Sequence, residues 1–572
     1  MPAAPEIEYG PWNPGLSSTI PNRLMPRVTL FDPANSFVSW KEAKELSDAI
    51  GLKPQELAVT RPERLALHSV LIRVTSQLYV PDGPNYADLG ISLRDMAAEI
   101  YDGSVKLEMA TIVAAYEEIR RETKVVVDEL LDEVYDPPEE HVEEPSGLFA
   151  RLLGKKKPRA KVKLHDPVER ARTLCIEWKD EHNEDVTTAS RRAIARTLGG
   201  ILNKRAALHV DREAIARVSV GLVMNRIGSA IVGRVVEGLF VRAVEAKGYR
   251  RLPPQSEPMV LNAKGASASG KSSIRPAQRE IAERLGYDWS DFAIISPDYW
   301  RKALLDYDGL GVDDKYAAML TGHELEVIDG KLDILMAVKG REGNVPHMLI
   351  DRFRFDSFRP GRVRSEDSTL LTRFGSKVYL FFLVTPPAAT VERAWTRGVE
   401  TGRFKAVDDL LYHNIEAYTG MPDLFFSWAK GRGKWVHYEF LDNSVARGER
   451  PRSIAYGQNG NLVILDFQKF CDIDRYQHVN VDAGGPDEVF KNALPSFDAT
   501  KFLRRAMKEM ARVDLVVPEG DAIFARSIGG RISVDIAQLP SGFDPECLGP
   551  FEEADSQIEI YDDNANVDNI GT

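Results

Sequence analysis

The segment of residues 265–272 has the composition of a loop that binds phosphate groups. It reads Gly-Ala-Ser-Ala-Ser-Gly-Lys-Ser, with a glycine at each end of the turn and a lysine directly after the second glycine. Glycines let the backbone curl until successive N–H groups point at phosphate oxygens, and a following helix start adds positive dipole character. In such a loop Lys271 neutralises the β- and γ-phosphates, while Ser272 reaches Mg²⁺. The pattern predicts a site for ATP and Mg²⁺ formed by Gly265, Ala266, Ser267, Ala268, Ser269, Gly270, Lys271, Ser272 and Ser273.

The sequence on either side of this loop favours a strand before it and a helix after it. An apolar run, Met259 to Leu261, precedes the loop, and a helical pattern begins at Lys271. A flexible glycine–serine linker is the alternative interpretation, and the Lys-Ser pair beside an amphipathic helix disfavours it. Pro276 falls inside the expected helix, where a proline removes a backbone hydrogen bond, so we expect a kink there.

Asp298 is the candidate catalytic base. It follows a second apolar run, Phe292 to Ile295, by three residues. Ligands of an open α/β sheet bind at the carboxyl ends of its strands, so a carboxylate at this place could accept the proton of an attacking hydroxyl group. Capping of a short helix over Tyr299 to Leu305 is the alternative role, and it is compatible with the first.

Asp351 is the candidate residue for the metal ion, together with Ser272. It ends the apolar run His347 to Asp351. A carboxylate at the end of a buried strand orders Mg²⁺ or its water shell in many proteins with a phosphate-binding loop. A surface aspartate that happens to end a strand is the alternative.

Three arginines follow the fourth apolar run and are candidates for stabilising a transferring phosphoryl group. Arg393 and Arg397 lie one helical turn apart, and Arg403 follows shortly after them. Guanidinium groups on one helix face can stabilise the charge that develops during phosphoryl transfer. Because Gly398 and Gly402 allow hinge movement, we expect a lid. A solvated helix whose arginines pair with neighbouring glutamates is the alternative.

Short apolar runs alternate with helical patterns in this part of the sequence. This alternation is typical of a parallel sheet built from βαβ units, and we expect the strands and helices of such a sheet to position the candidate residues. The predicted fold class is α/β: a P-loop kinase core with a parallel sheet, a largely helical N-terminal half before it and a small β-containing appendage after it. The expected strands are residues 259–261, 292–295, 348–350, 378–384 and 435–440. Asn459-Gly460 is a strong hairpin signal within the appendage.

Composition and charge blocks suggest how the chain divides. The opposite charge blocks between residues 136 and 166 predict a solvated linker, for which a nucleic-acid or membrane role of the basic part is the alternative. The expected regions are an extended or disordered leader (1–38), a helical region (39–135), the charged linker (136–166), a second helical region (167–250), the kinase domain (251–450), a small β-hairpin appendage (451–500) and a C-terminal region with an acidic mobile tail (501–572).

The overall composition indicates which class of partner and which cellular compartment to expect. The formal charge of −12 disfavours a general nucleic-acid binder and favours a small-molecule substrate. Three widely spaced cysteines fit a reducing compartment, and neither a secretory signal nor a transmembrane helix is expected. We therefore expect a cytoplasmic protein, while export into a host cell by a route that needs no such signal stays open.

Residues 255–445 resemble the zeta-toxin family of P-loop kinases. The residues that carry the resemblance are the loop from Gly265 to Ser272, Asp298 with Arg301, Asp351, and the arginines from Arg393 to Arg403. The chain is also similar to the zeta-toxin-like effector kinases that phosphorylate NAD, because the gap from Lys271 to Asp298 is long. The sequence departs from the family after the third strand, where Asp351-Arg-Phe-Arg-Phe-Asp356 replaces the usual glutamate and small turn residue.

The resemblance implies transfer of the γ-phosphate of ATP to a hydroxyl group of a nucleotide-linked ribose or sugar, with NAD and UDP-N-acetylglucosamine as representative acceptors. It also implies a toxin–antitoxin setting, in which a helical antitoxin or an internal inhibitory region within residues 40–247 blocks the nucleotide site. Two other functions stay open from the residues alone. One is a nucleotide-dependent switch or scaffold with little transfer activity, and the other is a polynucleotide 5′-kinase, which the acidic composition disfavours.

Overall fold

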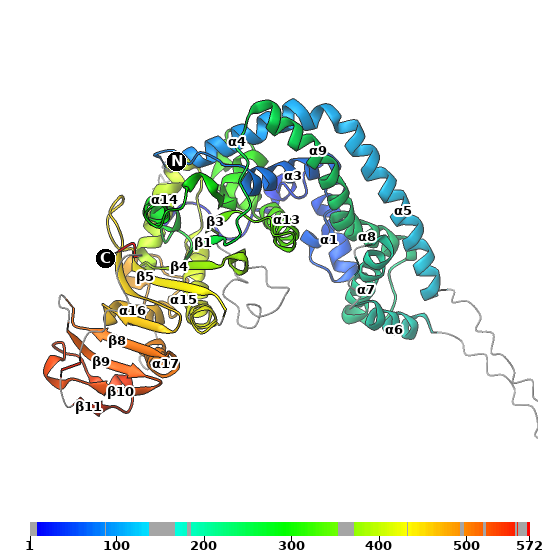
Figure 1. The fold of residues 1–572 in the computed structure, drawn as a ribbon. Helices are drawn as coiled ribbons and strands as arrows, with labels where there is room; N and C mark the ends of the chain where they lie inside the picture. The colour runs from blue at the N-terminus through cyan, green and yellow to red at the C-terminus, as the bar shows by residue number, and fades with distance from the viewer. Residues whose placement is uncertain are drawn as a thin grey trace, which may run out of the picture. The chain divides into compact units, whose positions relative to one another are not determined.

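The computed structural model describes residues 9–85, 87–135, 166–179, 183, 185–352, 371–431, 433–491, 497–518, 522–554, 557–558 and 569–571. The chain forms two compact units. A helical unit comprises Met25–Val70 and Glu99–Ala246, and a sheet unit comprises Met1–Leu24, Leu71–Ala98 and Lys247–Thr572. The sheet unit therefore includes a segment, residues 71–98, that the sequence placed in a helical region (Figure 1).

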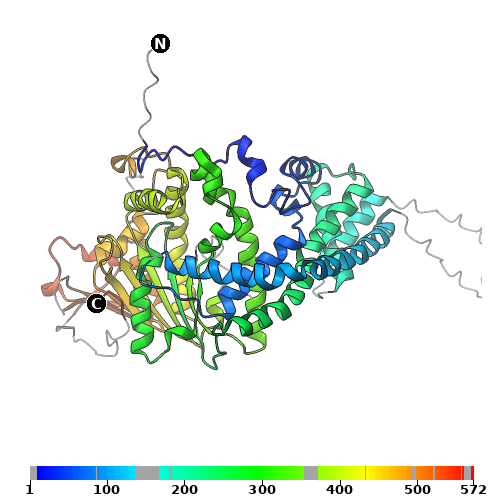
Figure 2. The same cartoon turned by 90° about the horizontal axis from the view of Figure 1, so that it is seen from above.

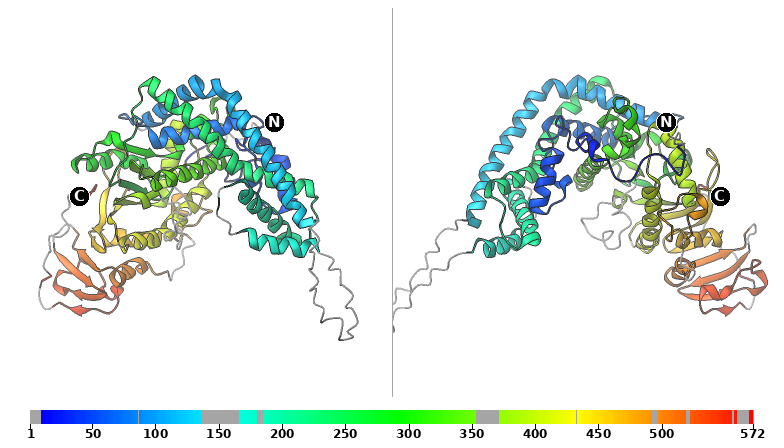
Figure 3. Two further views of the ribbon diagram at one scale, coloured as in Figure 1. Left: turned by 45° about the vertical axis from the view of Figure 1, so that its right-hand side comes forward. Right: turned by 180° about the vertical axis from the view of Figure 1, so that it is seen from behind.

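The expected helices between residues 40 and 247 are present. They are α1 (Trp40–Ile50), α2 (Pro54–Leu57), α3 (Pro62–Gln77), α4 (Asp88–Ile100), α5 (Met109–Tyr135), α6 (Pro167–Lys179), α7 (Val186–Arg205), α8 (Arg212–Val223) and α9 (Ser229–Lys247). Aspartates begin two of them: the side chains of Asp185 and Asp211 accept hydrogen bonds of 2.8 Å from the backbone N–H groups of Thr188 and Ala214. Within the helical unit α7 contacts both α6 and α8, and α5 is the longest helix (Figures 2 and 3).

The sheet unit contains one sheet with the order β11-β10-β9-β8-β7-β6-β5-β4-β1-β3-β2. The strands are β1 (Met259–Lys264), β2 (Phe292–Ile295), β3 (His347–Asp351), β4 (Lys377–Val384), β5 (Trp435–Asp442), β6 (Arg452–Gln458), β7 (Asn461–Ile464), β8 (Arg512–Val516), β9 (Ile523–Ile528), β10 (Arg531–Val534) and β11 (Glu552–Glu553). All five expected strands are present, and they form a parallel block in which β1 lies between β3 and β4. The molecule is thus α/β with a mostly parallel sheet.

Helices and single turns connect these strands. They are η6 (Lys271–Ile274), α10 (Arg275–Arg284), η8 (Pro297–Trp300), α11 (Arg301–Leu304), η9 (Asp308–Tyr316), α12 (Ala317–Leu320), α13 (Gly322–Arg341), α14 (Pro387–Thr401), α15 (Val407–Ala429), α16 (Phe467–Arg475) and α17 (Lys501–Glu509). The kink expected at Pro276 is absent because residues 271–274 form a 3₁₀ turn and α10 begins at Arg275. Pro276 therefore lies in the first turn of α10, where backbone N–H groups have no partner within the helix, so its missing N–H removes no helical hydrogen bond.

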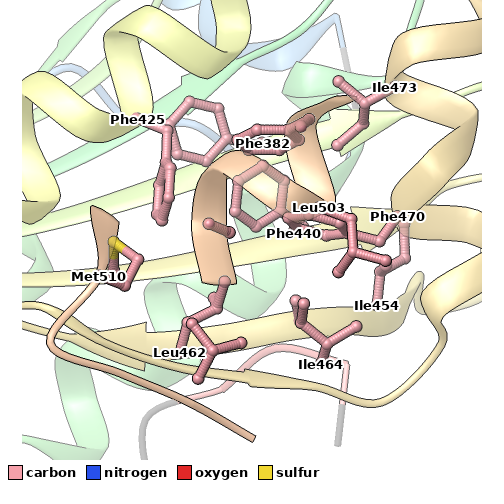
Figure 4. Close-up of a cluster of buried hydrophobic side chains, with 14 of the residues drawn as sticks. Phe382, Phe425, Phe440, Ile454, Leu462, Ile464, Phe470, Ile473, Leu503 and Met510 are labelled. Atoms are coloured by element: carbon pink, nitrogen blue, oxygen red, sulfur yellow. The ribbon is translucent and has the colours of Figure 1, made fainter. Parts of the chain in front are cut away.

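Aromatic side chains form the core between the sheet and three of these helices. Phe382 and Phe440, on neighbouring strands, stack with ring centroids 4.8 Å apart, and Phe425 of α15 meets Phe440 edge-on at 5.2 Å (Figure 4). Phe470 of α16 and Leu503 of α17 belong to the same buried cluster. Each such ring contributes roughly 2–3 kcal/mol by leaving water, so this face holds α15, α16 and α17 on the strands.

The expected β-hairpin is present, but it is not a separate appendage. Strands β6 and β7 pair in antiparallel fashion around Asn459 and Gly460, whose φ angles are +43° and +97°. Both positive values suit a tight hairpin turn, which explains the Asn-Gly pair. The hairpin continues the main sheet beside β5, and β8 to β11 extend it further, so most of residues 501–554 are part of the fold.

Two other expectations are corrected at the ends of the chain. Residues 1–8 lie outside the described residues, but the rest of the leader is not disordered. Leu24, Val28 and Phe31 are buried, and Trp12 packs against a buried cluster that includes residues of α14 and α15. The tail expected to be mobile falls partly outside the described residues, whereas Ile570 is buried and its N–H donates a 2.8 Å hydrogen bond to Glu439 of β5. The charged linker also lies outside the described residues, except for Asp166.

Candidate functional site

The carboxyl ends of the five parallel strands meet around the loop of residues 265–272. Thr385, after β4, donates a 3.0 Å hydrogen bond to the carbonyl oxygen of Ser269, and Asn443, after β5, donates one of 2.7 Å to the same oxygen. Asp351 ends β3, and Ser296, after β2, donates a 3.5 Å hydrogen bond to its carboxylate. The loop itself follows β1, so each strand of the block contributes one residue to this place.

The two glycines of the loop stand where a side chain does not fit. Gly270 has φ +94°, and a Cβ atom there would lie 2.2 Å from Nδ2 of Asn443. A Cβ atom at Gly265 would lie 2.6 Å from Oγ of Ser269 and 3.1 Å from the carbonyl oxygen of Leu383. Ala268 also has a positive φ, +61°, which is uncommon for alanine and marks a tightly curled loop.

Lys271 lies across the loop and reaches the acidic residues of the site. Its ammonium group donates hydrogen bonds of 3.2 and 2.9 Å to the carbonyl oxygens of Gly265 and Ala266. Burial lowers the pKa of Lys271, and the carboxylates of Asp351 and Asp298 oppose that effect. An ammonium group that bonds the backbone of the loop is suited to contact an anion held by the same loop.

Ser272 and Asp351, the residues expected at the metal ion, are in direct contact. The hydroxyl group of Ser272 donates a short hydrogen bond to the carboxylate of Asp351. One hydroxyl and one carboxylate fit the way Mg²⁺ is held beside phosphates, since this ion takes few protein ligands and keeps several waters. The described residues contain no cluster of three or more His, Cys, Asp or Glu side chains that would hold a metal by themselves.

Asp298 faces the loop and is held by two arginines. Nε of Arg301 donates a 3.0 Å hydrogen bond to one carboxylate oxygen, and Nη2 of Arg403 donates one of 2.6 Å to the other. Although partial loss of water favours the neutral acid, the guanidinium groups of Arg403, Arg301 and Arg397 hold the pKa of Asp298 well below its ordinary value. Ser296, not Asp298, occupies the position before the first helical residue, and it makes no side-chain cap. The carboxylate is therefore ionised and engaged with cations instead of with a helix end.

The three expected lid arginines have different surroundings. Arg403 contacts Asp298, and Arg397 lies close enough to Asp298 and Lys271 to alter the pKa of both. Arg393 instead donates hydrogen bonds of 2.7 and 3.0 Å to the carbonyl oxygens of Asn443 and Val445. Arg393 thus ties α14 to the end of β5, and only the other two arginines lie around the carboxylate.

Sequence reasoning missed a cluster at the start of α15. The ammonium group of Lys405 contacts the imidazole of His413 and lies 3.2 Å from the carboxylate of Asp409. Burial lowers the pKa of Lys405 to about 8, and burial together with Lys405 and Lys271 lowers that of His413 to about 2. Asp409 and His413 are four residues apart and so share one helix face, but nothing in their spacing alone indicates that Lys405 folds back to them.

Cationic side chains and carboxylates lie together around the loop of residues 265–272 in the part of the chain that the structure describes. The carboxylates are Asp298, Asp351 and Asp409, and the cations beside them are Lys271, Arg275, Arg301, Arg397, Arg403 and Lys405. Several of these groups are largely withdrawn from water, and each of the three carboxylates lies beside at least one cation. Guanidinium and ammonium groups of this kind are suited to contact phosphate groups.

Comparisons with models of protein families, with curated proteins and with solved structures found no match to this chain. Among the helices of the described residues, none is long and apolar enough to cross a membrane.

Proposed function

We propose that this protein is a small-molecule kinase of the P-loop type, similar to the zeta toxins, which transfers the γ-phosphate of ATP to a hydroxyl group. The observation that carries the proposal is the meeting of Lys271, the Ser272–Asp351 pair and Asp298 at the carboxyl ends of the parallel strands. Each of these groups has a part in phosphoryl transfer: a cation for the phosphates, a place for Mg²⁺, and a carboxylate that can accept a proton.

The roles of the residues follow from their positions. The curled loop and Lys271 bind the β- and γ-phosphates, while Arg397 and Arg403 stabilise the charge on the transferring group. Asp298 is ionised at neutral pH, which is the form that can accept the proton of the acceptor hydroxyl when Arg403 turns to the phosphate. Ser272 and Asp351 would hold Mg²⁺, which supplies charge neutralisation at the β- and γ-phosphates.

The acceptor that we propose is a nucleotide-linked ribose or sugar, of the NAD or UDP-N-acetylglucosamine type. The proposal rests on the resemblance described above and on the arginines beside Asp298, whose guanidinium groups suit a phosphate-bearing acceptor. The segment from Tyr307 to Thr321 follows Asp298 and would face the acceptor; Arg301 fixes it by hydrogen bonds of 2.5 and 2.9 Å to Ala318 and Thr321.

Incubation with γ-labelled ATP, Mg²⁺ and separate acceptors tests this function. The acceptors are NAD, UDP-N-acetylglucosamine, free nucleosides and 5′-hydroxyl oligonucleotides, and the measurement is which of them takes the label. We expect label on one of the nucleotide-linked acceptors, and we expect Lys271→Ala to abolish both ATP binding and labelling. Lys430→Ala is the matched control, because Lys430 pairs with Glu509 instead of lying in the site.

Other outcomes would point to the other functions considered. ATP binding without transfer to any acceptor would favour a nucleotide-dependent switch, and label on the oligonucleotide alone would favour a polynucleotide 5′-kinase. Wild-type protein that does not bind ATP at all would contradict every form of the proposal.

A further inference from the structure

Lys405 belongs to the loop that joins the two helices of the expected lid. Gly402 ends α14 with φ +73°, and the chain then passes through Arg403 and Lys405 before α15 begins at Val407. Arg403 turns toward Asp298, and Lys405 turns toward Asp409 and His413. One short loop therefore places two cationic side chains, those of Arg403 and Lys405, beside the site.

The surroundings of Lys405 are unusual for a lysine that only stabilises the conformation of a loop. Its side chain is 17 % exposed, and its closest partner, the imidazole of His413, is a neutral group that is itself largely buried. Asp409 is the carboxylate in contact with it, at 3.2 Å, and is 36 % exposed. A salt bridge that is open to water adds little to the free energy of unfolding. The pair with Asp409 therefore does not offset the cost of burying the ammonium group of Lys405.

The charges that face Lys405 connect it to the nucleotide site. Asp409 and His413 face it from α15, Arg397 from α14, and Asp298 from the turn after β2. His413 is in turn close enough to Lys271 for the two groups to interact electrostatically. Lys405 thus lies within electrostatic range of Arg397 and Asp298, and its partner His413 lies within range of Lys271, the residue that would contact the terminal phosphates of a bound triphosphate.

We propose that Lys405 is a second lysine ligand of the γ-phosphate, held by Asp409 and His413 until a triphosphate binds. This inference rests on the proposed function, because it names a further contact of the same nucleotide. The neutral imidazole of His413 accepts a hydrogen bond from the ammonium group of Lys405 but carries no negative charge that would hold it. The ammonium group can therefore leave His413 and donate to a phosphate oxygen instead. A diphosphate lacks the group that Lys405 contacts, so Lys405 makes the site prefer ATP to ADP.

The first test compares the dissociation constants of ATP and ADP by calorimetry. Removing one charge-assisted hydrogen bond costs about 10-fold or more in affinity. We expect Lys405→Met to weaken ATP binding by about that factor and to leave ADP binding nearly unchanged, so the preference for ATP shrinks. Lys430→Met is the control and should change neither constant.

The second test uses pH and keeps the inference testable if Lys405→Met does not fold. Because the pKa of Lys405 is lowered to about 8, the ammonium loses its proton as the pH rises through that value, and ATP affinity should fall above it. In Lys405→Arg the guanidinium stays charged, so this part of the pH dependence should disappear.

The two proposals fail in different ways. If the wild-type protein does not bind ATP, the proposed function itself is contradicted. If it binds ATP but Lys405→Met keeps the full preference for ATP over ADP, or if Lys405→Arg keeps the wild-type pH dependence, then only the role of Lys405 is contradicted. A wild-type protein that binds ATP and ADP equally tightly would also overturn that role.

Discussion

At the scale of single residues, Gly270 shows how closely the backbone of the loop is packed. Its φ of +94° disfavours any side chain, and Asn443 occupies the space that a Cβ atom would need. The same amide of Asn443 holds the carbonyl oxygen of Ser269. A substitution at Gly270 would therefore displace the residue that fixes the shape of the loop.

We predict that Gly270→Ala lowers ATP affinity by at least about 10-fold and lowers the free energy of unfolding by about 2 kcal/mol, the sum of backbone strain and displacement of Asn443. Gly286→Ala is a matched control, because Gly286 has φ +84° but no atom within 4 Å of the added carbon. It should cost about 1 kcal/mol in stability and leave ATP affinity unchanged. Calorimetric titration with ATP and urea unfolding measure the two effects; equal ATP affinity in the two variants would contradict the account.

At the scale of elements, α16 and α17 meet at a buried carboxylate. Asp474, near the end of α16, is 4 % exposed and accepts a 2.7 Å hydrogen bond from the N–H of Phe502 in the first turn of α17. Burial raises the pKa of Asp474 from 3.8 to about 6. The folded state therefore binds the proton more tightly than the unfolded state does.

The sign of the pH dependence follows from this shift. Between about pH 4 and pH 6 the folded chain holds a proton on Asp474 that the unfolded chain has lost, so this group's contribution to stability falls as the pH rises through that window. The expected loss is on the order of 3 kcal/mol. In Asp474→Asn, which can still accept the hydrogen bond from Phe502, that part of the dependence should vanish. Thermal unfolding at several pH values checks this, and identical pH profiles of the two proteins would refute it.

The elements that could be predicted from the sequence are those whose signal is local. Four of the five buried strands contain a continuous apolar run, β5 interrupts its run with His437 and Glu439, and the Asn459–Gly460 turn needs two positive φ angles. The residues that could not be predicted come together only through tertiary packing. Lys405 folds back onto His413, and Asn443 reaches Ser269 over 174 positions of sequence, so neither contact leaves a pattern in the chain.

The structure of the beginning of the chain differs from its prediction for a similar reason. Its many prolines and glycines suggested an extended or disordered leader, yet such residues are equally compatible with an irregular segment that packs tightly. Arg23 binds Asp313 through two hydrogen bonds of 2.7 and 2.6 Å, and Trp12 packs beside α14 and α15. Composition alone does not distinguish the two cases, because the partners lie hundreds of residues away.

At the scale of the whole molecule, residues 71–98 belong to the sheet unit although they lie far from it in sequence. Nε1 of Trp300 donates a 3.0 Å hydrogen bond to Thr75, and Nε1 of Trp289 donates one of 3.3 Å to Asp82. Both tryptophans are buried. The segment therefore covers part of the core beside β2 and the turn that carries Asp298.

We predict that a chain consisting of residues 251–572 alone does not unfold cooperatively, because removal of residues 71–98 exposes Trp289 and Trp300. Tryptophan fluorescence and limited proteolysis of this fragment check the prediction. Full-length Thr75→Val is a milder companion variant that should lose about 2 kcal/mol, because it removes the hydrogen bond from Trp300 and the 2.8 Å bond from Thr75 to the carbonyl oxygen of Leu71. A fragment that unfolds cooperatively and binds ATP as the full chain does would contradict this assignment. It would also show that residues 40–247 neither support nor inhibit the site.

The central claim is that Asp298 accepts a proton from an acceptor hydroxyl beside a bound triphosphate. Single-turnover transfer from γ-labelled ATP by wild-type protein and by Asp298→Asn, at ATP concentrations that saturate both, measures this most directly. We predict that Asp298→Asn binds ATP as tightly as the wild type or more tightly, since Arg403 is released, but transfers the label at least about 100-fold more slowly. Transfer at the wild-type rate by saturated Asp298→Asn would contradict the claim.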